Sequence, residues 1–345
     1  CKVVAKCIQT GKEILLYNQL KYGYNSLFCD KFNLETVDNR PLVKLDIPNS
    51  KIEIDLGYSI DYDEEKEDFE FDDNDHLETI NGEEISFDDV VRRYYQDKNL
   101  RINLLHAIEK IEVSIKRNIS FILGKRYGAF GYLDFSLWAN KNDNGKFKLE
   151  KEQFYFKRDL LKTISKSSLS DLKNKSNLNN DGFPTVWIVT ELLMFGNLVH
   201  LIELMSKKNQ RELADYYKCT IKELLSWLKC LNFVRNICAH NSNIIDIQLQ
   251  TKPIVRNEWS NKHLYTISDE QGNRVITNRI SVIVLIVITL VREINDKYRW
   301  KPIRSNLASI CKDNDDTKAN KNANLIGFAN STDALDLQSF AKEVI

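Results

Sequence analysis

The chain has 345 residues, 43% of them hydrophobic and 28% charged, which is the composition of an ordinary soluble globular protein. Its 49 Lys and Arg residues balance its 49 Asp and Glu residues. The zero net charge excludes a protein that attracts polyanions through its overall field, so any such site has to come from local clustering. Only 5 prolines and 12 glycines occur, which disfavours long linkers and favours helices, and we expect a mostly α fold.

The cysteines are scattered and form no CxxC pair, which is typical of reduced, buried thiols in a cytoplasmic protein. The longest apolar run, Ile280 to Val291, is short for a membrane span, and no signal peptide is visible. We therefore expect a cytoplasmic protein with no membrane partner, no metal and no cofactor. The cysteines are Cys1, Cys7, Cys29, Cys219, Cys230, Cys238 and Cys311.

The N-terminal quarter is dominated by a run of acidic residues. Residues 1–60 are expected to form a helical or irregular segment, and residues 61–85 an acidic insertion or loop. Between Asp61 and Asp89, fifteen acidic residues stand against a single basic one, Lys66. Self-repulsion and sparse apolar content predict a solvated segment there.

Residues 86–250 carry the clearest helical patterns and are expected to form the core. Ser86 is an expected N-cap, because Asp88 and Asp89 follow it and suit the positive end of a helix. This long helix carries a core-facing stripe at spacings of three and four residues. The stripe consists of Leu104, Ile108, Ile111, Ile115, Ile119 and Ile122.

Three further helices are expected in this core. One follows Pro184 over residues 185–205, with an interruption at Gly196 and Asn197, and a short one lies near residues 210–217. The last begins at Thr220 and Glu223, which form a capping-box pattern. Its core stripe consists of Leu224, Leu228, Leu231, Val234 and Cys238.

The stretch from Lys141 to Lys175 holds ten basic residues against five acidic ones, interleaved with four aromatics. Basic residues with interspersed aromatics suit phosphate contact and base stacking. The same pattern describes an amphipathic helix with a solvated face, and both interpretations stay open. Lys157, Arg158 and Lys162 are its candidate RNA-binding residues.

After Pro253 the pattern is weaker. Gln271-Gly272-Asn273 separates two short β-like runs, which predicts a small hairpin. The run from Ile280 to Val291 is ambiguous by period alone, and its continuation to Tyr298 favours a helix. We expect a hairpin plus a helix over residues 251–305 and a weakly structured tail over residues 306–345.

The strongest functional signal is the group Arg235, Asn236 and His240, near the end of the last core helix. An arginine binds a phosphate through paired, charge-assisted hydrogen bonds, and a histidine transfers a proton near neutral pH. Together they are the minimum set for cutting RNA without a metal. Spacing alone is weak support, because an Arg and a His five residues apart occur by chance in many helices.

The surroundings of this group resemble a known signature. Residues 227–241, from Trp227 through Arg235-Asn236 to Cys238-Ala239-His240, resemble the W-L-x-x-L-x-x-x-R-N-x-C-A-H helix of the bacterial abortive-infection AbiD/AbiF-like (Abi-like) family. The resemblance extends from about residue 15 to residue 245, with its other blocks in the family's order. These blocks are Tyr22–Tyr24, Ser86–Val90, Asp97–Arg101, Ala107–Glu112, Tyr127–Tyr132 and Pro184–Gly196.

The resemblance implies a HEPN-like helical bundle whose R-x4-H motif marks a metal-independent endoribonuclease. It implies that Arg235 binds the scissile phosphate, that His240 transfers the proton and that Asn236 orients one of them, with Asn241 as an adjacent RNA contact. The expected products are 2′,3′-cyclic phosphate and 5′-hydroxyl ends. It also implies a homodimer and RNA partners, namely the substrate and a regulatory antitoxin RNA.

Two other functions stay open at this stage. A non-catalytic HEPN module would hold a structured regulatory RNA in the same groove, and a structural helical protein would only dimerise. We also interpret Arg101, Glu109 and Glu112 as structural salt-bridge partners, and Trp187 and Trp227 as core aromatics.

Overall fold

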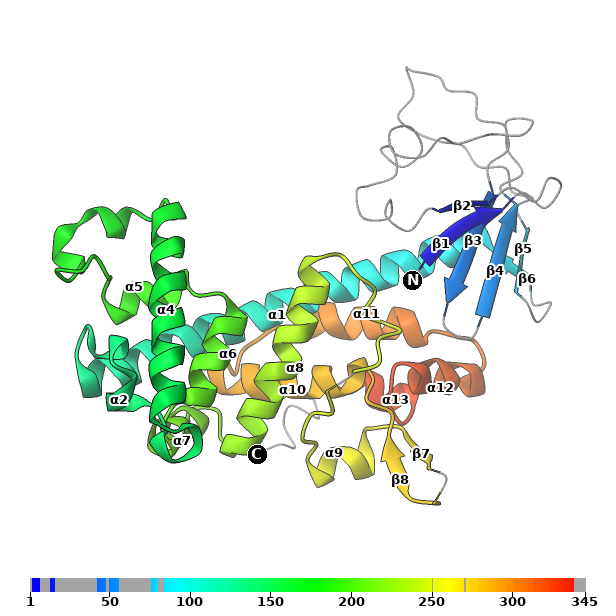
Figure 1. The fold of residues 1–345 in the computed structure, drawn as a ribbon. Helices are drawn as coiled ribbons and strands as arrows, with labels where there is room; N and C mark the ends of the chain where they lie inside the picture. The colour runs from blue at the N-terminus through cyan, green and yellow to red at the C-terminus, as the bar shows by residue number, and fades with distance from the viewer. Residues whose placement is uncertain are drawn as a thin grey trace. The chain divides into compact units, whose positions relative to one another are not determined.

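The structure is a computed structural model that describes residues 2–6, 13–15, 42–47, 50–55, 76–79, 84–249, 251–269 and 271–337. The chain divides into two compact units. The first comprises residues 1–99 and 241–243, and the second residues 100–240 and 244–345. Helices dominate the described residues, so the expected mostly α fold is confirmed (Figure 1).

The first unit contains an antiparallel sheet of six strands in the order β2-β1-β3-β4-β5-β6. In the central pair, β3 and β4, Leu42 lies opposite Asp55 and Ile47 opposite Ser50. The strands are β1 (Lys2–Lys6), β2 (Glu13–Leu15), β3 (Leu42–Ile47), β4 (Ser50–Asp55), β5 (His76–Thr79) and β6 (Glu84–Ser86).

These strands correct the prediction for the first 85 residues. Four of them lie within residues 1–60, where a helical or irregular segment was expected; β5 and most of β6 lie in the expected acidic insertion of residues 61–85. Residues 43–47 and 51–55 alternate apolar and charged side chains, which is the period of a half-buried strand. The prediction for residues 1–60 did not use that alternation. The rest of the acidic stretch lies outside the described residues.

Helix α1 (Phe87–Tyr127) begins directly after Ser86, as expected. All six residues of its predicted stripe, from Leu104 to Ile122, have no exposed surface, so the core-facing interpretation is confirmed. The second unit continues with α2 (Phe135–Trp138), α3 (Lys141–Asn144), α4 (Lys146–Lys166), α5 (Val186–Leu192), α6 (Phe195–Leu204), α7 (Lys207–Asp215) and α8 (Ile221–Ala239).

The predicted interruption between the helices after Pro184 is displaced. Leu193 and Met194 have extended backbone and separate α5 from α6, whereas Gly196 lies inside α6. The glycine serves packing there, because a Cβ at Gly196 would lie 3.4 Å from the side chain of Asn232 on α8. Gly196, which the sequence suggested as a helix break, is instead a point where α6 and α8 approach closely.

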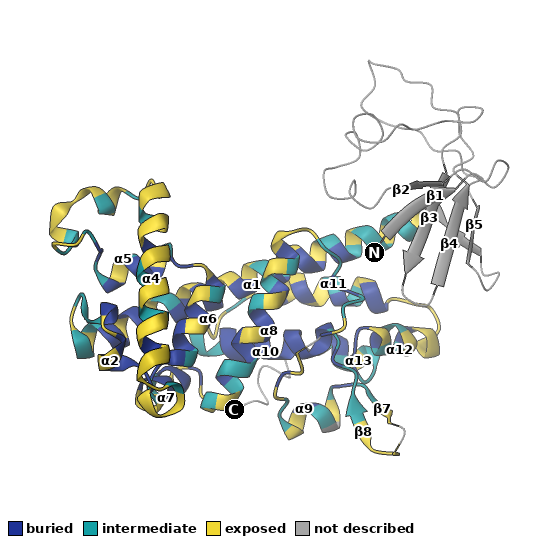
Figure 2. Cartoon of the chain, viewed as in Figure 1, coloured by how far each residue is buried: buried dark blue, intermediate teal, exposed yellow. Residues whose placement is uncertain are grey.

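The C-terminal part contains α9 (Asn257–Lys262), the expected hairpin of β7 (Thr266–Ser268) and β8 (Arg274–Ile276), and α10 (Ile280–Ile294). The twelve residues from Ile280 to Val291 are all buried. Figure 2 shows α10 buried along its length, which explains its lack of a polar face. No helix among the described residues has the length and apolar content that crossing a membrane requires.

The predicted weak structure of residues 306–345 is wrong for its described part. Helices α11 (Lys301–Cys311), α12 (Asp316–Leu325) and α13 (Ser331–Leu335) contact one another. The buried residues of α12 and α13 are few and small, namely Ala319, Ala323 and Ala334, whereas α11 buries Ile303, Leu307 and Ile310. The sequences of α12 and α13 therefore show little periodicity, and their alanines become part of a core only by packing among the three helices. Residues 338–345 lie outside the description.

Of the cysteines, Cys219, Cys230, Cys238 and Cys311 are described, and all four are free thiols. Three of them are buried. Burial raises the pKa of Cys230 to about 11 and that of Cys219 to about 12, so both stay protonated at neutral pH. The expectation of buried thiols is confirmed for Cys230, Cys238 and Cys311.

Candidate functional site

The predicted motif lies at the C-terminal end of α8, a helix whose N-terminal half is firmly anchored. The capping box is confirmed: the Glu223 backbone N–H donates to Thr220 Oγ1 at 3.2 Å, and the Thr220 N–H donates to Glu223 Oε2 at 2.7 Å. Trp227 is fully buried and donates from Nε1 to the Ile254 carbonyl at 2.7 Å. Its ring stacks on Trp259 at 5.4 Å between centroids.

The buried stripe of α8 orients the rest of the helix. Leu228, Leu231 and Val234 have no exposed surface, and the helix contacts α6, α7 and α10 (Figure 1). These contacts fix the rotation of α8 about its axis, so the residues between the stripe positions face outward. Asn236 and His240 are both exposed, and Arg235 is half-buried at the edge of the stripe.

His240 ends the helix as its C-cap residue, and its backbone N–H donates to the Asn236 carbonyl at 2.9 Å. Its exposed imidazole makes no hydrogen bond or ion pair within the described part of the chain. The ring nitrogens are therefore open to an incoming group, which is what proton transfer to or from a substrate requires.

Arg235 leans toward α1. Its Nε lies 3.7 Å from Glu112 Oε2, and its Nη1 lies 3.5 Å from Asn236 Oδ1. Both separations are long for hydrogen bonds. The contacts therefore orient the guanidinium while leaving its donors able to bind a phosphate bidentately.

Glu112 connects two cations at this site. Its Oε1 lies 3.4 Å from Lys116 Nζ, and only 12% of each of these two side chains is exposed. Lys116 Nζ in turn lies 3.9 Å from Glu191 Oε2 on α5. Because each acidic group faces a basic one, the cluster holds Arg235 in place without adding net charge.

Sequence reasoning missed the role of Glu112. It is a salt-bridge partner, as interpreted, but its partner is the predicted phosphate-binding arginine itself. The Glu-x3-Lys spacing of Glu112 and Lys116 on one helix predicts their ion pair. No sequence pattern connects Glu112 to Arg235, more than a hundred residues later in the chain.

The predictions for the two tryptophans have different outcomes. Trp227 is a core residue as predicted, whereas Trp187 is 50% exposed and the prediction is wrong for it. Trp187 lies over Gly124, where an added Cβ would approach its ring to 2.9 Å, so the ring packs on the surface of α1. Asn241 belongs to the first unit and has a φ of +55°, a left-handed conformation that asparagine tolerates better than most residues.

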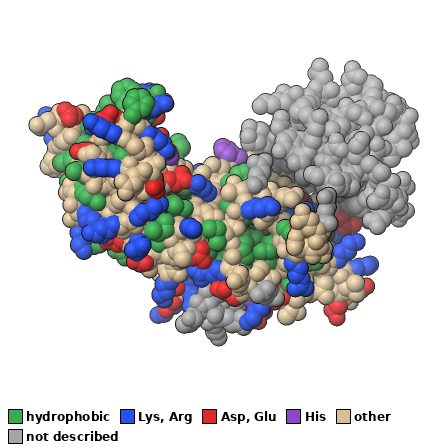
Figure 3. Space-filling view, turned by 60° about the horizontal axis from the view of Figure 1, so that its bottom comes forward, with side chains coloured by type: hydrophobic (Ala, Val, Ile, Leu, Met, Phe, Trp, Pro, Cys, Tyr) green, Lys and Arg blue, Asp and Glu red, His purple; other side chains and the backbone are tan. Residues whose placement is uncertain are grey.

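The predicted RNA-binding residues of α4 do not all lie together. Arg158 Nε donates to Asp159 Oδ1 at 2.8 Å, and Lys162 Nζ lies 3.6 Å from the same oxygen. The Arg158 hydrogen bond lowers the pKa of Asp159, so that carboxyl is ionised at neutral pH. Lys157 is less exposed and makes no ion pair in the described residues. Figure 3 shows Lys and Arg side chains spread over the visible face among acidic and apolar ones.

Of the four aromatics of α4, three point outward and one packs inward. Phe147 is 81% exposed, Phe154 is 65% exposed and Tyr155 is 40% exposed. Phe156 instead packs against the core at Phe135, with 5.5 Å between the ring centroids. The basic and aromatic helix is therefore amphipathic and also carries exposed aromatics, so both sequence interpretations describe part of it.

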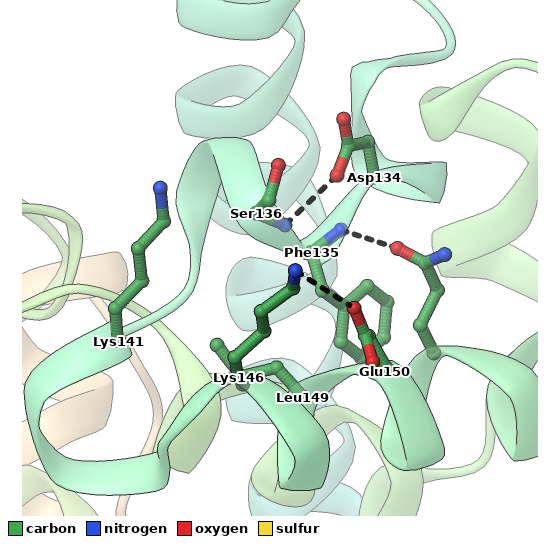
Figure 4. A pocket seen from close by; sticks show the side chains of 8 residues that line it. Asp134, Phe135, Ser136, Lys141, Lys146, Leu149 and Glu150 are labelled. Atoms are coloured by element: carbon green, nitrogen blue, oxygen red, sulfur yellow. Dashed lines mark hydrogen bonds and ion pairs between the residues drawn. The ribbon is translucent and has the colours of Figure 1, made fainter.

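A cavity of about 460 Å³ lies between α2 and the start of α4. Its polar groups already serve the fold (Figure 4): Asp134 accepts from the Ser136 N–H at 2.9 Å, and Lys146 lies 3.9 Å from Glu150. It contains no motif residue. The described residues also contain no group of three or more His, Cys, Asp or Glu side chains that could hold a metal ion.

The motif helix lies in the part of the chain that matches a known protein family. The model of the Abi-like protein family matches residues 54–246. This chain belongs to the Abi-like family. The match includes α1 to α8 and ends just beyond His240, whereas Tyr22–Tyr24 precede it. Family membership implies an abortive-infection role in defence against phage. Comparisons with curated proteins and with solved structures give no match.

Proposed function

We propose that this Abi-like protein is a metal-independent endoribonuclease, the toxin of an abortive-infection system. The observation that carries the proposal is the C-terminal end of α8. There a guanidinium is oriented by Glu112, and an exposed imidazole without a partner in the described residues follows five residues later. The anchored half of α8 and the ion pairs of Glu112 support both groups, which is the preorganisation that catalysis needs.

In the proposed reaction, the 2′-hydroxyl oxygen of RNA attacks the adjacent phosphorus and gives up its proton. The bond between phosphorus and the 5′-oxygen breaks, and that oxygen takes up a proton. Arg235 binds the non-bridging oxygens and stabilises the charge that grows on them, while His240 transfers a proton. Asn236 orients the imidazole or the phosphate. The products are a 2′,3′-cyclic phosphate and a 5′-hydroxyl.

We also propose that the active form is a homodimer. Five residues of α-helix turn through about 140° beyond a full turn, so a single α8 does not aim Arg235 and His240 in the same direction. The reaction also needs one group to accept a proton and one to donate it. A second copy of α8 facing the first would place its own Arg235 and His240 on the opposite side of the phosphate. It would also supply the second imidazole.

The mechanism is tested by His240→Ala and Arg235→Ala in the full chain. Each is expected to lower RNA cleavage about 10²- to 10⁴-fold, the usual contribution of a positioned acid–base group or charge stabiliser. Cleavage is followed on labelled transcripts, and 5′-hydroxyl ends are detected by their phosphorylation with polynucleotide kinase. His106→Ala and Arg211→Ala are the matched controls, since both are exposed and outside the motif. Cleavage by the double variant at the wild-type rate would refute the mechanism.

The dimer is tested by mixing. Wild-type protein and excess His240→Ala protein are incubated until subunits exchange, and cleavage is measured per wild-type chain. If both copies contribute to one site, activity per wild-type chain falls in proportion to the wild-type fraction. If activity per wild-type chain stays the same at every mixing ratio, the two copies do not share a site.

A second candidate function is a non-catalytic module that holds a structured regulatory RNA. The exposed aromatics of α4, with Arg158 and Lys162 beside them, favour it. Co-purified RNA together with an absence of cleaved ends in every transcript tested distinguishes it from the nuclease. If the nuclease is correct, the same surface is where we expect an antitoxin RNA to bind.

A further inference from the structure

A second cavity, of about 150 Å³, lies between α4 and α6, away from the motif. Its volume is about half of the roughly 300 Å³ at which pockets for drug-sized ligands begin, so it suits a single small ring system. The inner wall is apolar and aromatic, formed by Phe135, Phe156 and Leu201, which are mostly buried. Tyr155 lines the cavity as well and is 40% exposed.

The mouth of this cavity is polar and rich in hydrogen-bond acceptors. Glu152 and Asp159 contribute carboxylates from α4, and Asn197 and His200 contribute an amide and an imidazole from α6. His200 Nε2 lies 2.9 Å from Glu152 Oε2. The Asn197 amide is exposed and makes no hydrogen bond in the described part of the chain. One donor and one acceptor are therefore open beside two carboxylates.

Basic side chains lie around the mouth of the cavity. Arg158 and Lys162 both face Asp159, and the Arg158 guanidinium lies 4.7 Å from the centre of the Tyr155 ring. Lys151 Nζ lies 5.9 Å from the same ring. Because the charges of Arg158 and Lys162 balance those of Glu152 and Asp159, a polyanion meets no net negative charge there. Arg158, Lys162 and Lys151 can contact phosphates on either side of an inserted ring.

The geometry points to a subsite for one unpaired nucleobase of single-stranded RNA, and specifically for a base with an exocyclic amino group. The aromatic wall offers a stacking surface, the carboxylate of Glu152 accepts from the amino group, and Asn197 pairs with the neighbouring ring atoms. Uracil presents a carbonyl oxygen where cytosine presents the amino group, so uracil would face the carboxylate with an acceptor. The inference rests on the proposed function in taking RNA as the ligand.

Helix α6 connects this subsite to the motif. Asn197 and His200 face the cavity, while the adjacent face of α6 contacts α8 through Gly196 and Asn232 and through the ion pair of Glu203 with Lys229. Asn232 lies one turn before Arg235 and Asn236 on α8. An RNA strand with one base in the cavity is thereby held beside the helix that carries the proposed catalytic groups, which would give cleavage a base preference.

The test uses the full chain with His240→Ala, so that RNA is not consumed, and two octanucleotides, oligocytidine and oligouridine. These probes differ only at ring positions 3 and 4 of the base. We expect oligocytidine to bind roughly tenfold more tightly, the effect of one well-placed hydrogen-bonding pair. Glu152→Gln or Asn197→Ala should abolish that preference. Glu150→Gln is the matched control, because Glu150 lies on the same helix outside this cavity and pairs with Lys146.

Equal binding of the two oligonucleotides overturns the inference, as does a preference that survives Glu152→Gln. Cytidine monophosphate binding as tightly as oligocytidine also overturns it, since the occupant is then a free nucleotide. The outcome is separable from the proposed function. Loss of the preference in Glu152→Gln supports the subsite even if no RNA is cleaved. Cleavage without any base preference supports the nuclease and contradicts the subsite.

Discussion

The two ends of α8 differ in what their polar groups do. At the N-terminal end, Glu223 and Arg256 pair at 2.7 Å, and the guanidinium of Arg256 lies 5.1 Å from the centre of the Trp227 ring. At the C-terminal end, Arg235 makes only long contacts, at 3.7 Å with Glu112 and at 3.5 Å with Asn236, and the imidazole of His240 is open. The polar side chains at the N-terminal end of α8 stabilise the fold. Those at the C-terminal end remain available to bind a ligand.

This difference is what a catalytic helix needs. A group that reacts with a substrate has to be accessible, and accessible groups contribute little to folding. The helix that carries them has to be held by other residues. In this protein the holding residues are the buried stripe of α8, its anchored N-terminal end and Glu112 on α1, so the site tolerates exposure without losing its geometry.

The largest expected contrast is in stability. Trp227→Ala removes a fully buried aromatic side chain and should lower the free energy of unfolding by about 3–5 kcal/mol. His240→Ala should change it by less than about 0.5 kcal/mol, because the side chain is exposed. Urea denaturation followed by circular dichroism measures both. A large loss of stability in His240→Ala would show that the two ends of α8 do not differ in this way.

The next expected effect concerns the orientation of Arg235. Glu112→Gln keeps the size of the side chain but removes the charge that faces Arg235 and Lys116. We expect RNA cleavage to fall roughly ten- to a hundredfold because the guanidinium loses its fixed direction. The control is Glu109→Gln, an exposed position one turn earlier on α1. Equal cleavage rates in these two variants would mean that Glu112 serves only the fold.

The smallest expected effect is the pH dependence of folding stability that Glu223 contributes at the N-terminal end of α8. Burial acts to raise the pKa of Glu223, but hydrogen bonds from Thr220 and Arg256 outweigh it, so the pKa lies below its ordinary value of 4.5. Because the folded pKa is depressed, the stabilisation is present above the unfolded pKa and is lost as pH falls through the folded value. Thermal denaturation from pH 6 to pH 3 should show a smaller loss of stability in Glu223→Gln than in the wild type. Parallel curves for the two proteins would contradict this role.

Much of the helical core was predictable because its signals are local. The stripe of α1, the capping box of α8 and the hairpin at Gln271-Gly272-Asn273 each depend on residues a few positions apart. The sheet of the first unit was missed although residues 43–47 alternate in period two, because a strand is stable only when it pairs with other strands along the chain. Helices α12 and α13 were missed because each buries only one or two alanines, which form a core only together with α11.

By itself, the sequence determined where α8 begins, which of its faces is buried and which residues stand at its C-terminal end, since these follow from capping and from a 3.6-residue period. Only the tertiary structure decided that Glu112 orients Arg235, that Trp187 lies on the surface, and that a cavity with an apolar wall and a polar mouth lies between α4 and α6. Each of these depends on side chains far apart in the chain, and their meeting is set by how helices pack rather than by any local pattern.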